Sequence, residues 1–131
     1  MTRANAIQGC NLEITSLVNG ATVHNKALVE GKGNIPDNTH LWVFAHLKGF
    51  NRWWPQGAGE AGILDGRWSA QAFFGEPGEL GQFEVVAMVV DHQTDRNLKK
   101  WVEEGSNKGI ILPDPVKECS VKKITVEKVG N

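Results

Sequence analysis

Short runs of apolar residues, separated by glycine, proline and asparagine, recur along most of the chain. Two of these runs, His40–Leu47 and Gln82–Val90, are rich in apolar residues at both odd and even positions. Since successive side chains of a strand point to opposite faces, such a run predicts a strand that is buried on both sides. We therefore expect these two strands to lie side by side at the centre of a sheet.

Other runs are shorter, and turn signals such as Asn19-Gly20 and Asp65-Gly66 separate them. They predict further strands at Cys10–Thr15, Ala27–Gly31, Arg67–Phe74 and Cys119–Val129. Arg52–Gln56 is predicted to be a short edge strand or a loop, because Pro55 has no backbone N–H to donate to a ladder. The pattern thus gives about seven strands.

One segment, Thr94–Glu104, has a different period. Its apolar residues fall at helical spacing, and they are Leu98, Trp101 and Val102. Asp95 or Thr94 is the expected N-cap, and Gly105 is the expected stop. We predict a single helix before the last strand, with Trp101 docking it onto the sheets.

The fold class that this pattern predicts is all-β, an immunoglobulin-like or fibronectin type III-like sandwich of about seven strands with one inserted helix. Trp42 and Trp68 are expected to pack in its interior. The predicted core consists of Leu12, Ile14, Leu28, Val43, Ala45, Val85, Ala87, Val89 and Val126. A shift of one residue in any strand would move its residues to the opposite face.

Composition limits the class of protein. The chain has 131 residues, 40% of them hydrophobic and 22% charged, which is typical of one globular domain. We place this domain at 10–131, after a disordered or extended stretch at 1–9. The net charge of −1 and the absence of a basic cluster argue against a nucleic-acid partner. The longest apolar run, Val85–Val90, is too short to insert into a membrane.

The N-terminal residues and the cysteines bear on the compartment. Met1–Gln8 lacks the apolar stretch of a signal peptide, so a cytoplasmic protein is expected unless a leader has been removed. Cys10 and Cys119 lie near opposite ends of the chain, just inside the first and last predicted strands. They form a disulfide if the fold brings those strands together, and otherwise they are two buried thiols.

No metal site is predicted. The four histidines, His24, His40, His46 and His92, are scattered along the chain without the short spacing that zinc ligands usually have. Asp91, His92 and Asp95 could together hold calcium, but capping of the following helix explains them more simply.

Several segments resemble one family. They are Ile14–Val23, Val29–Gly33, His40–Phe44, Trp53–Gln56, Asp65–Ser69 and Phe83–Asp91. Together they resemble bacterial immunoglobulin-like accessory domains that occur beside protease-like or signalling modules, over about residues 10 to 130. The resemblance implies a sandwich with a binding or spacer role, and it supplies no catalytic residues.

Motifs of catalysis are absent from the sequence. It contains no nucleophile elbow, phosphate loop, zinc-binding His-Glu motif or dinucleotide fingerprint. We expect neither an enzyme nor a cofactor, although an acidic pair contributed by distant strands would escape this search.

The candidate binding site is Arg52, Trp53, Trp54 and Gln56. Adjacent residues of a strand point to opposite faces, so both tryptophans cannot enter one core, and at least one indole should be accessible. Such a ring suits a protein partner or, alternatively, a sugar stacked on it. In the competing interpretation, one indole fills the core and the other packs under the Gly57–Gly62 loop.

Overall fold

The structure is a computed structural model, and it describes residues 10–57, 59–105 and 108–130. The predicted N-terminal stretch 1–9 lies outside these residues. The described part contains eight strands and one helix in the order β1 (Glu13–Ile14), β2 (Ala21–Val23), β3 (Lys26–Lys32), β4 (His40–Leu47), β5 (Trp54–Pro55), β6 (Arg67–Phe73), β7 (Gly81–Val90), α1 (His92–Glu103) and β8 (Lys122–Lys128).

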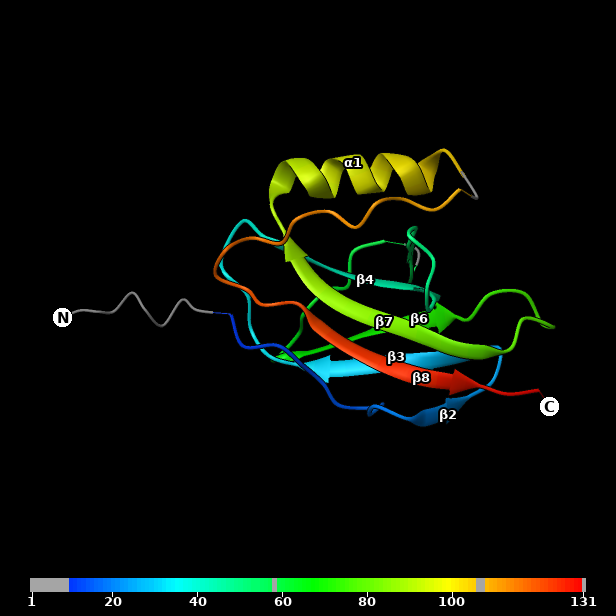
Figure 1. Ribbon diagram of the computed structural model, residues 1–131. Helices are drawn as coiled ribbons and strands as arrows, with labels where there is room; N and C mark the ends of the chain where they lie inside the picture. Colours follow the sequence, from blue (N-terminus) through cyan, green and yellow to red (C-terminus); the bar gives the residue numbers. More distant parts are fainter. Residues whose placement is uncertain (1–9, 58, 106–107, 131) are drawn as a thin grey trace.

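The strands form two sheets, which confirms the all-β class with one helix. One sheet has the order β1-β3-β6, and the other has the order β2-β8-β7-β4-β5. All neighbouring strands are antiparallel except β2 and β8, which are parallel. Val29 and Trp68 of the smaller sheet share one buried cluster with Val43 and Val85 of the larger, so the sheets pack face to face. Helix α1 lies on the outer side of the larger sheet (Figure 1).

The two central strands are adjacent, as predicted. Strand β4 pairs with β7 from His40 opposite Val90 to Leu47 opposite Phe83. One face of this pair meets the smaller sheet, and the other packs against the helix, so both faces are apolar. The predicted edge strand is confirmed as β5, which forms one of the two edges of the larger sheet.

Most of the predicted core is buried, including Leu12, Val43, Ala45, Val85, Ala87, Val89, Val126, Trp42 and Trp68, whereas Ile14 is half-buried. The prediction for Leu28 is wrong, because Leu28 is 48% exposed and its neighbour Val29 is fully buried. Gly31 lies on the same face as Val29, and a Cβ on Gly31 would come within 2.1 Å of the Trp68 ring. Because this inward position is a glycine, the inward-facing residues of the strand do not form an apolar pattern in the sequence.

Strand β2 was not predicted. It is three residues long and pairs in parallel with β8, placing Val23 in the core. So short a run carries too few alternating positions to be recognised from the sequence.

The helix begins earlier than predicted, because its N-cap is Asp91 and neither Asp95 nor Thr94. The Asp91 side chain accepts a hydrogen bond from the Thr94 backbone N–H at 2.8 Å. Asp95 instead turns toward the sheet and is buried. Gly105, with φ of 67°, follows the helix as predicted. No helix in the described ranges is long and apolar enough to cross a membrane.

The helix contacts the sheet through Leu98 and Val102, which pack in the cluster around Trp42 and Phe44. Trp101 is half-buried, and its indole N–H donates to the Lys108 carbonyl at 3.1 Å. It thereby ties the helix to the segment that follows.

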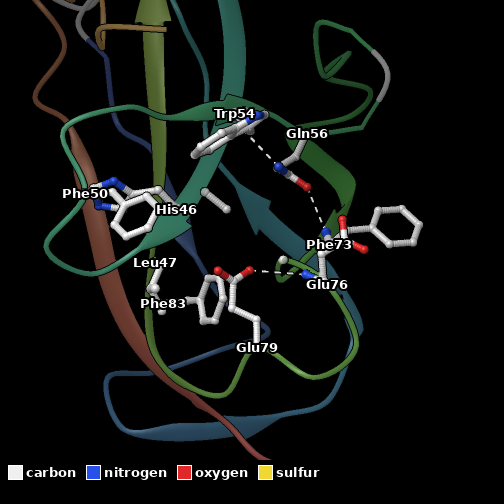
Figure 2. A pocket seen from close by; sticks show the side chains of 11 residues that line it. His46, Leu47, Phe50, Trp54, Gln56, Phe73, Glu76, Glu79 and Phe83 are labelled. Carbon is white, nitrogen blue, oxygen red and sulfur yellow. Dashed lines mark hydrogen bonds between the residues drawn. The ribbon is translucent and has the colours of Figure 1, made fainter. Parts of the chain in front are cut away.

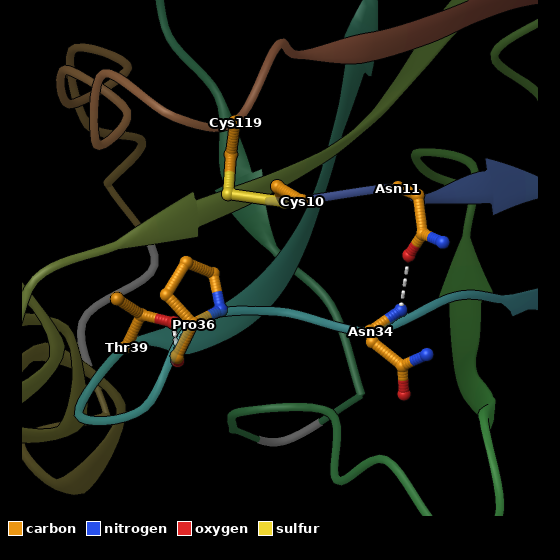
Figure 3. The surroundings of a disulfide bond; sticks show 6 residues. All are labelled: Cys10, Asn11, Asn34, Pro36, Thr39 and Cys119. Atoms are coloured by element: carbon orange, nitrogen blue, oxygen red, sulfur yellow. Dashed lines mark hydrogen bonds between the residues drawn. A yellow bond between two sulfur atoms is a disulfide. The ribbon is translucent and has the colours of Figure 1, made fainter. Parts of the chain in front are cut away.

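Cys10 and Cys119 form a disulfide, with their Cα atoms 4.9 Å apart (Figure 3). This finding decides between the bridge and the two free thiols. Both cysteines lie outside the strands, Cys10 before β1 and Cys119 before β8. Because β1 and β8 belong to different sheets, the bond joins segments that lead into different layers, and not two neighbouring strands.

Candidate functional site

A hollow of about 500 Å³ lies where β4, β5, β6 and β7 contribute residues at one end of the sheets (Figure 2). Four aromatic residues from separate segments line it, together with two acidic residues of the loop between β6 and β7. These six residues are Phe50, Trp54, Phe73, Phe83, Glu76 and Glu79. We call this hollow the aromatic groove.

Two phenylalanines lie on opposite sides of the aromatic groove in Figure 2, with the Phe73 ring turned outward at its edge. Phe50, in the turn after β4, is 50% exposed, and Phe73, the last residue of β6, is 53% exposed. Phe83, between them, is buried and Trp54 is half-buried. Large apolar rings exposed around one hollow are typical of a surface that a partner covers.

Trp54 is fixed by its strand and by a close backbone neighbour. It pairs with Ala45 across the β4–β5 ladder. A Cβ on Gly109 would lie 3.0 Å from the Trp54 ring and 2.7 Å from the Arg52 Cβ. Gly109 therefore lets the chain after the helix pass close to the indole, and a larger residue there would have to displace it.

Gln56 holds the two sides of the aromatic groove together. Its side-chain amide donates to the Trp54 carbonyl at 2.9 Å, and its side-chain oxygen accepts from the Phe73 N–H at 2.7 Å. These bonds connect β5 of the larger sheet to β6 of the smaller. The predicted binding residue Gln56 is buried, and its amide is engaged within the protein. Its role in the groove is to position its neighbours.

Trp53 faces away from the aromatic groove. Its ring stacks on His46 with centroids 3.4 Å apart, and it packs beside the helix-side cluster. The neighbouring indoles thus have different surroundings, as expected, but both are half-buried. Arg52 is exposed, and its backbone carbonyl contacts His46. Of the four predicted residues, Trp54 and Gln56 line the groove, while Arg52 and Trp53 do not.

His46 joins this region to β7. Its Nδ1 lies 3.0 Å from the Arg52 carbonyl oxygen, and its Nε2 lies 2.7 Å from Glu84 Oε1. Both neighbours are oxygen atoms of the protein, so each ring nitrogen of His46 faces a partner within the fold. Burial acts to raise the pKa of Glu84, but hydrogen bonds from His46 and Lys123 outweigh it and hold this pKa below its ordinary value.

A buried lysine holds the segment that carries the acidic residues of the aromatic groove. The Lys128 ammonium is buried and donates to the carbonyls of Phe74 and Glu76, 5.7 Å from the centre of the Phe83 ring. Glu79 Oε1 accepts from the Glu76 N–H at 3.2 Å. No lysine or arginine is among the described residues that line the groove, so its charged rim is acidic.

Five lining residues were not predicted from the sequence, namely Phe50, Phe73, Phe83, Glu76 and Glu79. They are far apart in the chain and meet only after the strands have paired. One local signal was available in the pair Phe73-Phe74, since an aromatic pair at a strand end must leave one ring outside the core. Phe74 is fully buried and Phe73 is the exposed member.

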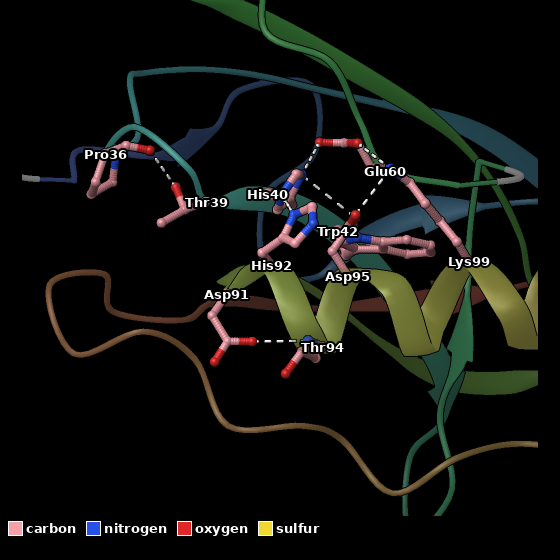
Figure 4. Close-up of polar contacts among 10 residues, drawn as sticks. All are labelled: Pro36, Thr39, His40, Trp42, Glu60, Asp91, His92, Thr94, Asp95 and Lys99. Atoms are coloured by element: carbon pink, nitrogen blue, oxygen red, sulfur yellow. Dashed lines mark hydrogen bonds and ion pairs between the residues drawn. The ribbon is translucent and has the colours of Figure 1, made fainter.

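A separate polar cluster lies at the other end of β4, next to the first turn of the helix (Figure 4). His40 and His92, treated as scattered in the sequence, have Nε2 and Nδ1 only 3.2 Å apart. Lys99 lies 2.9 Å from both Asp95 and Glu60, and its hydrogen bonds to these carboxylates raise the pKa of its ammonium.

No protein-family model matches the chain, and no curated protein does. The resemblance to bacterial immunoglobulin-like accessory domains therefore stays a prediction, and the function must be argued from the geometry.

Proposed function

We propose that this chain is a non-catalytic binding module that holds a short segment of a protein partner in the aromatic groove. The observation that carries the proposal is the pair Phe50 and Phe73, each about half exposed, on opposite sides of a hollow of about 500 Å³. Covering such rings removes apolar surface from water at about 25 cal/mol per Å². An immunoglobulin-like accessory domain would have the same role.

The chemistry of the aromatic groove indicates what the partner segment carries. Trp54 and Phe83 line the hollow between the exposed rings and suit one large apolar side chain. Glu76 and Glu79 lie beside it, with no lysine or arginine among the described lining. A lysine or arginine next to the apolar anchor would meet these carboxylates. The expected motif is an aromatic or large aliphatic residue flanked by a basic one.

A glycan is the second candidate from the sequence, and the geometry favours it less. A sugar platform needs a flat exposed ring, but Trp53 stacks on His46 and Trp54 is half-buried. The exposed rings belong to Phe50 and Phe73, on different sides of the hollow. An irregular aromatic hollow of this kind is typical of peptide recognition.

The proposal is tested by selecting peptides from a displayed random library on the purified chain. We expect enrichment of an aromatic or large aliphatic residue beside lysine or arginine. For a selected peptide, Phe73→Ser should raise the Kd at least about fivefold, because truncating an aromatic anchor costs more than about 1 kcal/mol. Fluorescence anisotropy of the labelled peptide measures this change.

The matched control is Leu64→Ser, since Leu64 is 78% exposed and does not line the aromatic groove. It should leave the Kd unchanged. If Phe50→Ser and Phe73→Ser both bind the selected peptides as tightly as the wild type, the groove is not the binding surface. A glycan array run in parallel that gives ligands, when the peptide library gives none, would replace the peptide proposal with the glycan.

A further inference from the structure

The pairing of β4 with β7 brings two histidines to one corner of the molecule. His40, the first residue of β4, lies opposite Val90, the last residue of β7. The chain then turns at Asp91 into the helix, whose first residue is His92. Residues separated by 52 positions therefore become direct neighbours (Figure 4).

The two imidazoles meet at a distance suited to a shared metal ion. His40 Nε2 and His92 Nδ1 are 3.2 Å apart, and the ring planes are tilted by 41°. An ion about 2.0–2.1 Å from two nitrogens at a tetrahedral angle separates them by about 3.3–3.4 Å. The observed separation requires little movement of either side chain. Without an ion, one imidazole N–H donates to the other ring.

A carboxylate orients the His40 ring through Nδ1, the nitrogen that does not face His92. Glu60 Oε2 lies 2.7 Å from His40 Nδ1, and Glu60 Oε1 lies 2.9 Å from the Lys99 ammonium. A hydrogen bond from Nδ1–H to a carboxylate leaves the lone pair on Nε2, the atom that faces His92. The same carboxylate–histidine arrangement orients histidine ligands in known zinc sites.

A buried carboxylate completes the group. Asp95 is 1% exposed, and a ligand atom from each of His40, His92 and Asp95 lies within 4.8 Å of the others. The Trp42 indole N–H donates to Asp95 Oδ1 at 2.8 Å, and Lys99 lies 2.9 Å from Oδ2. The carboxylates of Glu60 and Asp95 against the one ammonium of Lys99 leave a net negative charge, which favours a cation.

We propose that this corner binds a divalent transition-metal ion of the zinc class through His40 Nε2 and His92 Nδ1, with Asp95 as the acidic third ligand. Two imidazoles and one carboxylate suit zinc, copper, nickel or cobalt, whereas calcium and magnesium prefer oxygen ligands alone. His92 is exposed, so an ion held by its ring is open to solvent on that side. This site is separate from the aromatic groove.

The test is calorimetric titration of the full chain, without a histidine tag, with zinc chloride. We expect one ion per chain. His40→Gln and His92→Gln should each weaken binding at least about tenfold, and Glu60→Gln should weaken it by about tenfold or more, because it removes the group that orients His40. The matched control is His24→Gln, which alters an exposed histidine outside the cluster and should bind zinc as the wild type does.

A nuclear magnetic resonance spectrum of the imidazole nitrogens gives a second readout. Zinc should shift the signals of His40 Nε2 and His92 Nδ1 and leave those of His24 in place. His92 is exposed on the first turn of the helix, so His92→Gln should fold even if His40→Gln does not. The proposal is overturned if zinc does not bind, if His92→Gln binds it as tightly as the wild type, or if His24→Gln loses as much affinity.

Discussion

His40 and His46 stand on the same strand, β4, and each lies 2.7 Å from a glutamate. Their surroundings differ in what faces the second nitrogen. For His46 it is the Arg52 carbonyl, and the side chain is 4% exposed beneath Trp53. For His40 it is another imidazole, that of the exposed His92, and the His40 side chain is 17% exposed.

The comparison shows how two similar pairs acquire different roles. Both nitrogens of His46 face oxygen atoms of other segments, so neither is open to a ligand, and the side chain ties these segments together. A histidine with a carboxylate on one nitrogen and a second imidazole on the other keeps a lone pair that a metal can use. Both histidines have a carboxylate on one ring nitrogen. What distinguishes the structural histidine from the candidate ligand is the group that faces the other ring nitrogen.

The largest expected effect is the loss of stability when His46 is replaced. His46→Ala removes the ring that lies between Glu84 Oε1 and the Arg52 carbonyl and also removes the stack on Trp53, so it should lower the free energy of unfolding by about 3 kcal/mol. His40→Ala should cost about 1 kcal/mol, because this cluster is more open to water. Urea denaturation of both variants measures the difference. If both variants lose the same free energy of unfolding, or if His40→Ala loses more, the distinction between the two histidines is contradicted.

A smaller effect is expected for the hydrogen bond from Trp42 of β4 to Asp95 of the helix. Trp42→Phe removes the indole N–H that donates to the buried Asp95, so it should lower the free energy of unfolding by about 2 kcal/mol. Trp68→Phe is the matched control, since Trp68 is also buried but donates to the Lys32 carbonyl at 3.4 Å. It should cost about 1 kcal/mol less. If both substitutions cost the same by urea denaturation, the Trp42–Asp95 bond contributes no more than the other.

The smallest expected effect is the pH dependence of the stability that Glu84, the partner of His46, contributes. The pKa of Glu84 is held below its ordinary value of 4.5 in the folded chain, so its ion pair contributes stability above pH 4.5 and loses it as the pH falls through the lower, folded pKa. Glu84→Gln should lower the free energy of unfolding at about pH 7 by about 1 kcal/mol. Urea curves at several pH values should show this difference shrinking on acidification. A difference that stays constant down to about pH 3 would mean that the charge of Glu84 is not its source.

Much of the fold could be predicted because its central strands carry a strong pattern. β4 and β7 are apolar on both faces, since one face meets a sheet and the other a helix. Leu28 was misplaced because the inward partner of Val29 is a glycine covered by Trp68. The N-cap was misplaced because Asp91 and Asp95 are both plausible caps in sequence, and only the structure shows Asp95 bonded to Trp42.

The sites were harder to predict, because their residues meet only through strand pairing. The four aromatic residues of the groove come from four segments, and only Trp54 among them was predicted from the sequence. His40 and His92 lack a short ligand spacing in sequence. Given the register of β4 against β7, their proximity would have followed, so the missing information was the pairing and not the chemistry.

The disulfide between Cys10 and Cys119 has a topological consequence. It closes a covalent ring with a sequence separation of 109, and all eight strands except β8 lie inside that ring in the described chain. A protease that cuts one peptide bond within the ring therefore opens it without releasing a fragment. On a gel, such a nicked chain should migrate as one species until a reductant is added, and then separate into two.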